Sequence, residues 1–170
     1  MSRSLVIVSS YHHRNTEKVA KVFAKILDAE IRTPQQVDPE ELQEYGLIGF
    51  GSGIYDGMNH RALLDLVDRL PQITDKEAFI FSTSGVTKRH QPEMHLPLIG
   101  KLKAKGYTIV GEFNCKGFNT NSFLRVFGGM NKGRPNAEDL KRAEEIAQDL
   151  RERLKRKIMI AESTSRTTIE

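Results

Sequence analysis

Short, nearly continuous apolar runs alternate with longer segments of helical periodicity along this 170-residue chain. Such runs are typical of strands buried on both faces of a parallel sheet covered by helices. They are LVIV (5–8), LIGF (47–50), AFIF (78–81) and YTIV (107–110), with a weaker strand at EIRT (30–33). Between them, apolar residues recur every three or four positions. This spacing predicts helices over 16–28, 60–70, 94–105 and 137–156.

The alternation predicts an α/β fold, a three-layer doubly wound sandwich. Right-handed crossovers place helices on both faces of a five-stranded parallel sheet, for which the strand order 2-1-3-4-5 is suitable. We expect a single domain over residues 1–160. The last residues, AESTSRTTIE (161–170), are polar and are predicted to form a mobile tail.

The predicted topology indicates where a ligand binds. In open α/β sheets, ligands bind beyond the carboxyl ends of the strands, where the strand order reverses. Three loops should meet there, and a fourth follows the last strand; they are SSYHHRNT (9–16), GSGIYDGMNH (51–60), STSGVTKRH (82–90) and 114–134. This arrangement fits a mononucleotide, with its phosphate on the first loop and a planar ring between the second and third.

The first loop has the features of an anion site. It begins with two serines and ends at a helix N-terminus, where free N–H groups and the helix dipole favour a phosphate. The absence of a Walker lysine and of a G-x-G-x-x-G pattern argues against nucleoside triphosphates and dinucleotides. The adjacent pair His12 and His13 is not predicted to bind a metal, because neighbouring positions rarely direct both imidazoles at one ion.

The second and third loops offer small and apolar groups. Gly51 and Gly53 would let the backbone approach a ligand closely, and Ile54 and Tyr55 would cover a flat ring. The third loop, STSG (82–85), offers backbone N–H groups at a strand end.

Composition and charge narrow the class of protein. With 38% hydrophobic and 28% charged residues, the chain is typical of globular proteins. Its net charge of +4 comes from RERLKRK (151–157), which complements a helix C-terminus and contains no aromatic residue, so we expect no nucleic-acid binding. The apolar runs are too short for a transmembrane segment or a signal peptide, and Cys115 has no partner for a disulfide. These features favour the cytoplasm.

Three motifs carry a resemblance to a known family: NTEKVA (15–20), GFGSGIY (49–55) and FSTSG (81–85). Over residues 4–155 the chain resembles the flavodoxin family, and NCKGF (114–118) with the later GGMNKGRPNAEDL is similar to a branch common in archaea and anaerobes. The resemblance implies non-covalent FMN and low-potential electron transfer in place of ferredoxin, with no catalytic residue and no metal. It implies ferredoxin-linked oxidoreductases as partners and a monomer or weak dimer.

The resemblance also implies the FMN-binding residues, grouped by the part of FMN that they contact. The phosphate group contacts Ser9, Ser10, His12, His13, Arg14, Asn15 and Thr16. One ring face contacts Ser52, Gly53, Ile54 and Tyr55, and the pyrimidine edge contacts Thr83, Ser84 and Gly85. The last strand brings Cys115, Lys116, Gly117 and Phe118 toward the ring.

The first loop departs from the family pattern, Ser/Thr-x-Thr-Gly-Asn-Thr. His13 and Arg14 stand at its Thr-Gly positions, so Arg14 must adopt a glycine's backbone conformation, or the loop differs in shape. If protonated histidine helps to hold the phosphate, FMN binds tighter near pH 6 than near pH 8, since histidine ordinarily titrates at about 6.5. Flavodoxins are usually acidic, and this basic chain is expected to have a higher potential for the second reduction step.

One other function fits part of the sequence, and a second does not. GSGIYDGMNH also resembles the matching loop of the menaquinone-linked protoporphyrinogen dehydrogenases, which share the fold and FMN. Apolar residues in 114–134 would then bind substrate, or else they cover the flavin and the core; they are Phe118, Phe123, Leu124, Val126, Phe127 and Met130. A phosphorylation-type signalling domain needs acidic residues where this chain has Ser9-Ser10 and Gly51-Ser52.

Overall fold

The computed structural model describes residues 3–11, 13–85, 92–120 and 128–167. Its strands are β1 (Arg3–Ser9), β2 (Glu30–Arg32), β3 (Tyr45–Tyr55), β4 (Met58–Asn59), β5 (Lys76–Ser84) and β6 (Tyr107–Lys116). Five of them form a parallel sheet in the order β2-β1-β3-β5-β6, and β4 pairs antiparallel with β3. The predicted order 2-1-3-4-5 is confirmed, because the fourth and fifth predicted strands are β5 and β6.

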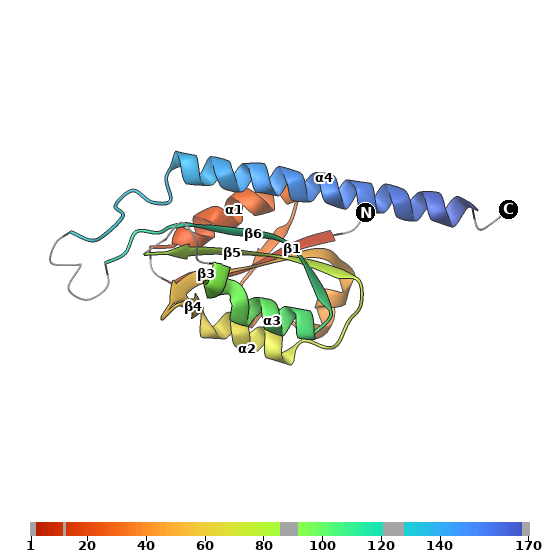
Figure 1. Ribbon diagram of the computed structural model, residues 1–170, viewed down its shortest axis with the longest axis horizontal. Helices are drawn as coiled ribbons and strands as arrows, with labels where there is room; N and C mark the ends of the chain where they lie inside the picture. Colours follow the sequence, from red (N-terminus) through yellow and green to blue (C-terminus); the bar gives the residue numbers. More distant parts are fainter. Residues whose placement is uncertain (1–2, 12, 86–91, 121–127, 168–170) are drawn as a thin grey trace.

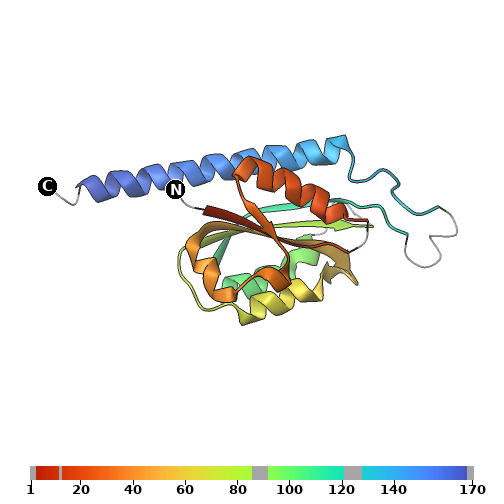
Figure 2. The ribbon, with the colours of Figure 1, turned by 180° about the vertical axis from the view of Figure 1, so that it is seen from behind.

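Helices cover both faces of the sheet. They are α1 (Asn15–Leu27), α2 (Arg61–Arg69), α3 (Leu96–Ala104) and α4 (Ala137–Thr167), with 3-10 turns η1 (Pro34–Gln36), η2 (Pro39–Glu44) and η3 (Pro92–His95). α1 and α4 lie on one face, and α2 and α3 lie on the other (Figures 1 and 2). The three-layer doubly wound sandwich is therefore confirmed. Within the described ranges, no helix combines the length and the apolar character needed to cross a bilayer.

Successive strand residues point to opposite faces of the sheet and so build two apolar cores. In β1, Leu5 and Ile7 pack toward α2 and α3, whereas Val6 and Val8 pack toward α1 and α4. On the second face a Cβ on Gly51 would lie 2.1 Å from the ring of Phe81. Gly51 therefore leaves room for an aromatic ring of the core on this face of the sheet.

The predicted loop 51–60 is largely a β-hairpin. β3 continues to Tyr55, turns through Asp56 and Gly57, and returns as β4. The two turn residues have φ of 50° and 80°, the pair of positive values that a type I′ hairpin turn requires. The sequence signal was the Asp-Gly dipeptide, and the turn folds Tyr55 back beside the carboxyl edge of the sheet.

Helix α4 is longer than predicted. It was expected to end at residue 156 but continues to Thr167, because residues 137–167 contain no glycine or proline to end it. The Ser163 and Thr164 hydroxyls donate to the Ile160 carbonyl, at 2.8 and 3.0 Å. Residues 161–167, predicted to be a tail, are thus the last turns of a helix that runs past the edge of the sheet (Figure 1).

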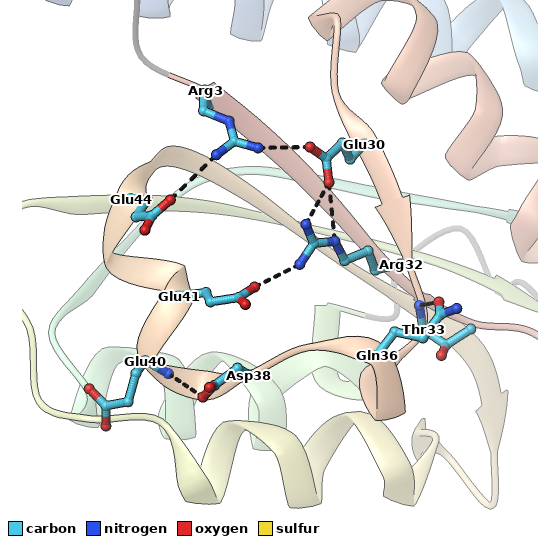
Figure 3. A network of polar contacts seen from close by, with 9 residues as sticks. All are labelled: Arg3, Glu30, Arg32, Thr33, Gln36, Asp38, Glu40, Glu41 and Glu44. Atoms are coloured by element: carbon cyan, nitrogen blue, oxygen red, sulfur yellow. Dashed lines mark hydrogen bonds and ion pairs between the residues drawn. The ribbon is translucent and has the colours of Figure 1, made fainter.

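Ion pairs hold the edge strand β2 in place (Figure 3). Arg3 lies 2.7 Å from Glu30 and 3.4 Å from Glu44, and Arg32 bonds to Glu30 and Glu41 at 2.7 and 2.8 Å. A short, charged edge strand resists pairing with other chains, although each exposed pair contributes little stability. This network joins β2 to the start of β1 and to η2, away from the carboxyl edge where the loops meet.

Candidate functional site

A cavity opens at the carboxyl edge of the sheet, among the loops that follow β1, β3, β5 and β6. Its lining residues are Ser10, Asn15, Thr16, Gly53, Ile54, Tyr55, Thr83, Ser84, Gly85, Gly117, Phe118 and Asn119. All of these except Asn119 were predicted as site residues. The structure therefore brings together most of the residues that the resemblance implied.

The first loop reaches the cavity through two residues with left-handed backbone. His13 and Arg14 have φ of 52° and 51°, so Arg14 does adopt the conformation of the glycine that it replaces. Arg14 is the N-cap of α1 and makes no side-chain cap, and the Ser10 hydroxyl accepts from the Glu17 N–H at 3.4 Å. The first turn of α1 thus meets the cavity with the positive end of its dipole, where an anion is stabilised.

Asn15 joins the first loop to the segment after β6. Its Nδ2 donates to the Phe118 carbonyl at 2.8 Å, which fixes the orientation of the amide. Its Oδ1 is buried and has no hydrogen-bond donor among the residues that the structure describes. Since Asn15 lines the cavity, a hydroxyl group of a ligand is the kind of donor that would satisfy this oxygen.

A row of polar side chains lies beneath the cavity. Ser9, Ser52 and Ser82 occupy one register position on β1, β3 and β5, and Asn114 extends the row on β6. The Ser52 hydroxyl donates to the Gly53 carbonyl at 2.8 Å and accepts from the His60 N–H at 2.9 Å.

Ser9 and Ser52 were predicted to contact a ligand. Instead, Ser9 Oγ lies 3.1 Å from His60 Nδ1, and Ser52 Oγ accepts hydrogen bonds from Asn59 and His60. Neither serine lines the cavity.

His95 completes this row on the α3 side. Ser82 Oγ lies 2.7 Å from His95 Nε2, and Glu112 Oε2 lies 2.9 Å from Nδ1. Because Asn114 donates to the Ser82 hydroxyl, we assign this hydroxyl as the donor to Nε2 and the Nδ1–H of the imidazole as the donor to Glu112. Burial lowers the pKa of His95, and Glu112 opposes this effect. The atoms are ordered as in a serine hydrolase, but Ser82 is fully buried and cannot attack a substrate.

Two predicted residues of the last strand do not reach the cavity. Cys115 packs with Phe113 in the core between the sheet and helices α1 and α4, because it points to that face of β6. Burial raises the pKa of its thiol to about 12, so the thiol is unreactive. Lys116 does not line the cavity either, whereas Gly117 and Phe118 do.

The segment after β6 packs onto the first and third loops. The His13 ring lies 4.5 Å from that of Phe118, and His13 Nε2 lies 2.8 Å from Thr120 Oγ1. Asn119 forms an antiparallel bridge with Met130. No sequence signal marked Asn119, since only this packing brings it to the cavity.

Some predicted residues lie outside the described ranges: His12, residues 86–90 of the third loop, and Phe123, Leu124, Val126 and Phe127. Among the residues that are described, no group of three or more His, Cys, Asp or Glu could hold a metal ion.

Comparison with known proteins gives consistent matches. A sequence model described as "Flavodoxin domain" matches residues 5–129. An uncharacterized protein from Methanocaldococcus jannaschii is 44% identical over 148 residues, covering 87% of this chain and 97% of the relative.

Solved structures show the same fold. A flavodoxin from the domain Archaea superposes with a TM-score of 0.61 at 17% identity, covering 90% of this chain and 99% of the other. Oxidised flavodoxin 2 from Bacillus cereus gives 0.63 at 18% identity, with 86% and 95% covered. Rubredoxin oxygen:oxidoreductase from Desulfovibrio gigas gives 0.66 at 17% identity, covering 91% of this chain and 37% of that larger one.

Proposed function

This chain belongs to the flavodoxin family, and we propose that it is a low-potential electron carrier that binds FMN non-covalently. The observation that carries the proposal is the cavity itself. It combines a helix N-terminus whose N-cap residue makes no side-chain cap, hydroxyl-bearing side chains and two aromatic residues, at the reversal of strand order where such folds bind ligands. FMN would supply the redox chemistry, and the protein would bind it and set its potential.

The lining residues suit the three parts of FMN. Ser10, Thr16 and the N-terminal N–H groups of α1 would hold the phosphate, and Asn15 Oδ1 would accept from a ribityl hydroxyl. Ile54 and Tyr55 would cover the ring, and the segment Thr83–Gly85 would meet its polar edge. Arg14 is exposed just outside the lining and would add positive charge near the phosphate.

As an electron carrier, the protein would act on partner proteins. We propose that ferredoxin-linked oxidoreductases donate electrons to this carrier and accept electrons from it. We also propose that the carrier is a monomer or weak dimer in the cytoplasm. These parts of the proposal rest on the family resemblance of the sequence.

The visible spectrum of the purified protein tests the proposal. We expect flavin absorption bands as isolated or after reconstitution with FMN, and a blue or red semiquinone on partial reduction. A colourless protein that cannot be reconstituted would contradict FMN binding. Turnover of a porphyrinogen with a quinone, without ferredoxin-linked electron transfer, would assign the protein to the dehydrogenase alternative instead.

A further inference from the structure

A second cavity lies beside the β3–β4 hairpin and the start of α2, and Tyr55 lines both cavities. Its volume is about 780 Å³, within the range of small-molecule sites. We call it the aromatic pocket; it is lined by Tyr11, Tyr55, Asp56, Met58, Asn59, His60, Arg61 and Leu64. The FMN proposal uses none of these residues except Tyr55.

The walls of the aromatic pocket are flat and apolar. The rings of Tyr11 and His60 lie 4.7 Å apart and tilted by 37°, and Tyr55 meets His60 edge-on at 5.4 Å. The Tyr11 side chain is 60% exposed and that of Met58 43%, so large apolar surfaces are left open to solvent here. Walls of this kind favour a planar aromatic ligand, which can pack against the rings.

Asn59 gives the aromatic pocket an unsatisfied acceptor. Its Nδ2 donates to Ser52 Oγ at 3.1 Å, and this identifies Oδ1 as the unpaired atom of the amide, because the Ser52 hydroxyl itself donates to the Gly53 carbonyl. Asn59 is almost fully buried, and its Oδ1 has no donor within the described part of the chain. Buried acceptors are nearly always bonded, so this oxygen indicates a ligand that carries a donor.

His60 offers the complementary group. Its Nδ1 accepts from the Ala62 N–H at 3.2 Å, which places the proton of the neutral ring on Nε2. A ligand hydroxyl could therefore donate to Asn59, after a small turn of the amide toward the cavity, and also accept from His60.

We propose that the aromatic pocket is a binding site for a planar, mostly apolar aromatic molecule with a hydroxyl group, such as a two-ring phenol. The aromatic walls select the flat ring system, and Asn59 selects the hydroxyl. The site is separate from the proposed FMN cavity and does not require FMN for binding.

The test uses 2-naphthol as the probe and the full-length protein saturated with FMN, with binding measured by calorimetry. We expect one saturable site per chain. We also expect 2-methoxynaphthalene, which has the same rings but no donor, to bind about fivefold more weakly, the effect of one lost hydrogen bond. The same titration is repeated on FMN-free protein, where the affinity for 2-naphthol should be unchanged.

Two exposed methionines provide matched variants. Met58→Glu places a charge on the rim of the aromatic pocket and should weaken 2-naphthol binding at least tenfold. Met159→Glu makes the same change at a 68% exposed position on α4 and should leave the affinity within twofold of the native value. Both positions are exposed, so neither variant should unfold the protein.

Several results would overturn the proposal. These are no saturable binding, equal effects of the two variants, or release of FMN by the probe, which would place the probe in the FMN cavity. If Met58→Glu instead alters the oligomeric state seen by gel filtration, the pocket is a contact between copies of the chain.

Discussion

Thr16 Oγ1 and Thr83 Oγ1 lie 2.8 Å apart in the protein interior, although 67 residues separate them in the sequence. This hydrogen bond joins the first turn of α1 to the end of β5, and both threonines line the proposed FMN cavity. This buried pair of hydroxyls therefore links the first loop directly to the third loop.

Replacing either threonine should show how much this hydrogen bond contributes to the free energy of unfolding. Thr16→Val or Thr83→Val leaves one buried hydroxyl unpaired and should lower the free energy of unfolding by about 1–3 kcal/mol. The double variant should be less destabilised than the sum of the single ones, because it leaves no unpaired hydroxyl. Urea denaturation of the FMN-free protein measures this, with Thr16→Ser as the control that keeps the bond. Additive effects would mean that the two hydroxyls do not interact in solution.

Arg14 is predicted to be a position where glycine stabilises. Its φ of 51° is unfavourable for a residue with a Cβ, so Arg14→Gly should raise the free energy of unfolding by about 0.5–1 kcal/mol. Lys18→Gly, an exposed position within the same helix, should lower it by about 1 kcal/mol. Arg14→Gly should also weaken the salt dependence of FMN binding, because it removes a cation near the phosphate. A loss of stability in Arg14→Gly would disprove the left-handed loop.

Two exposed glycines should respond in opposite ways to replacement by alanine, because one lies in the type I′ turn and the other lies in a helix. Gly57→Ala forces a side chain into φ of 80° and should destabilise the protein by about 1 kcal/mol, although the space around it is open. Gly100→Ala in helix α3 also has open space and should stabilise by roughly 0.5–1 kcal/mol. Thermal melts of the two variants would decide this, and equal shifts would argue against the hairpin.

The buried His95 predicts that stability falls as the pH drops. Burial lowers its pKa in the folded state, so below about pH 6.5 the unfolded chain takes up a proton that the folded chain excludes. Unfolding free energy should be constant near pH 7–8 and fall toward pH 5, by at most about 1.4 kcal/mol per pH unit for each such proton.

His95→Gln should reduce this slope, and the pH dependence of urea midpoints measures it. His60, whose pKa burial also lowers, should supply the remaining slope, so His60→Gln serves as the comparison. An unchanged slope in His95→Gln would show that folding does not shift the pKa of this ring.

The order of helices and strands was predictable because each element carries its own periodicity. Four-residue apolar runs located four of the strands, and three-to-four spacing located the helices. The ends were less certain. α4 extends to Thr167 because no glycine or proline ends it, and β3 extends to Tyr55 through GSGIY (51–55), whose glycines had predicted a loop. The Asp56-Gly57 signal was present but its hairpin was not predicted.

The sequence by itself determined the layered fold and the loops that meet at the carboxyl edge, because local patterns of apolar and polar residues indicate both. Most of the residues that line the cavity were implied by the family resemblance of the sequence. Only the tertiary structure decided which side chains turn inward. Cys115 lies on the edge strand β6, where the packing of α1 and α4 shows that it points into the core rather than into the cavity. The pairing of Ser9 with His60 and the contact of Asn119 with the cavity arise between distant segments, and only packing brings them together.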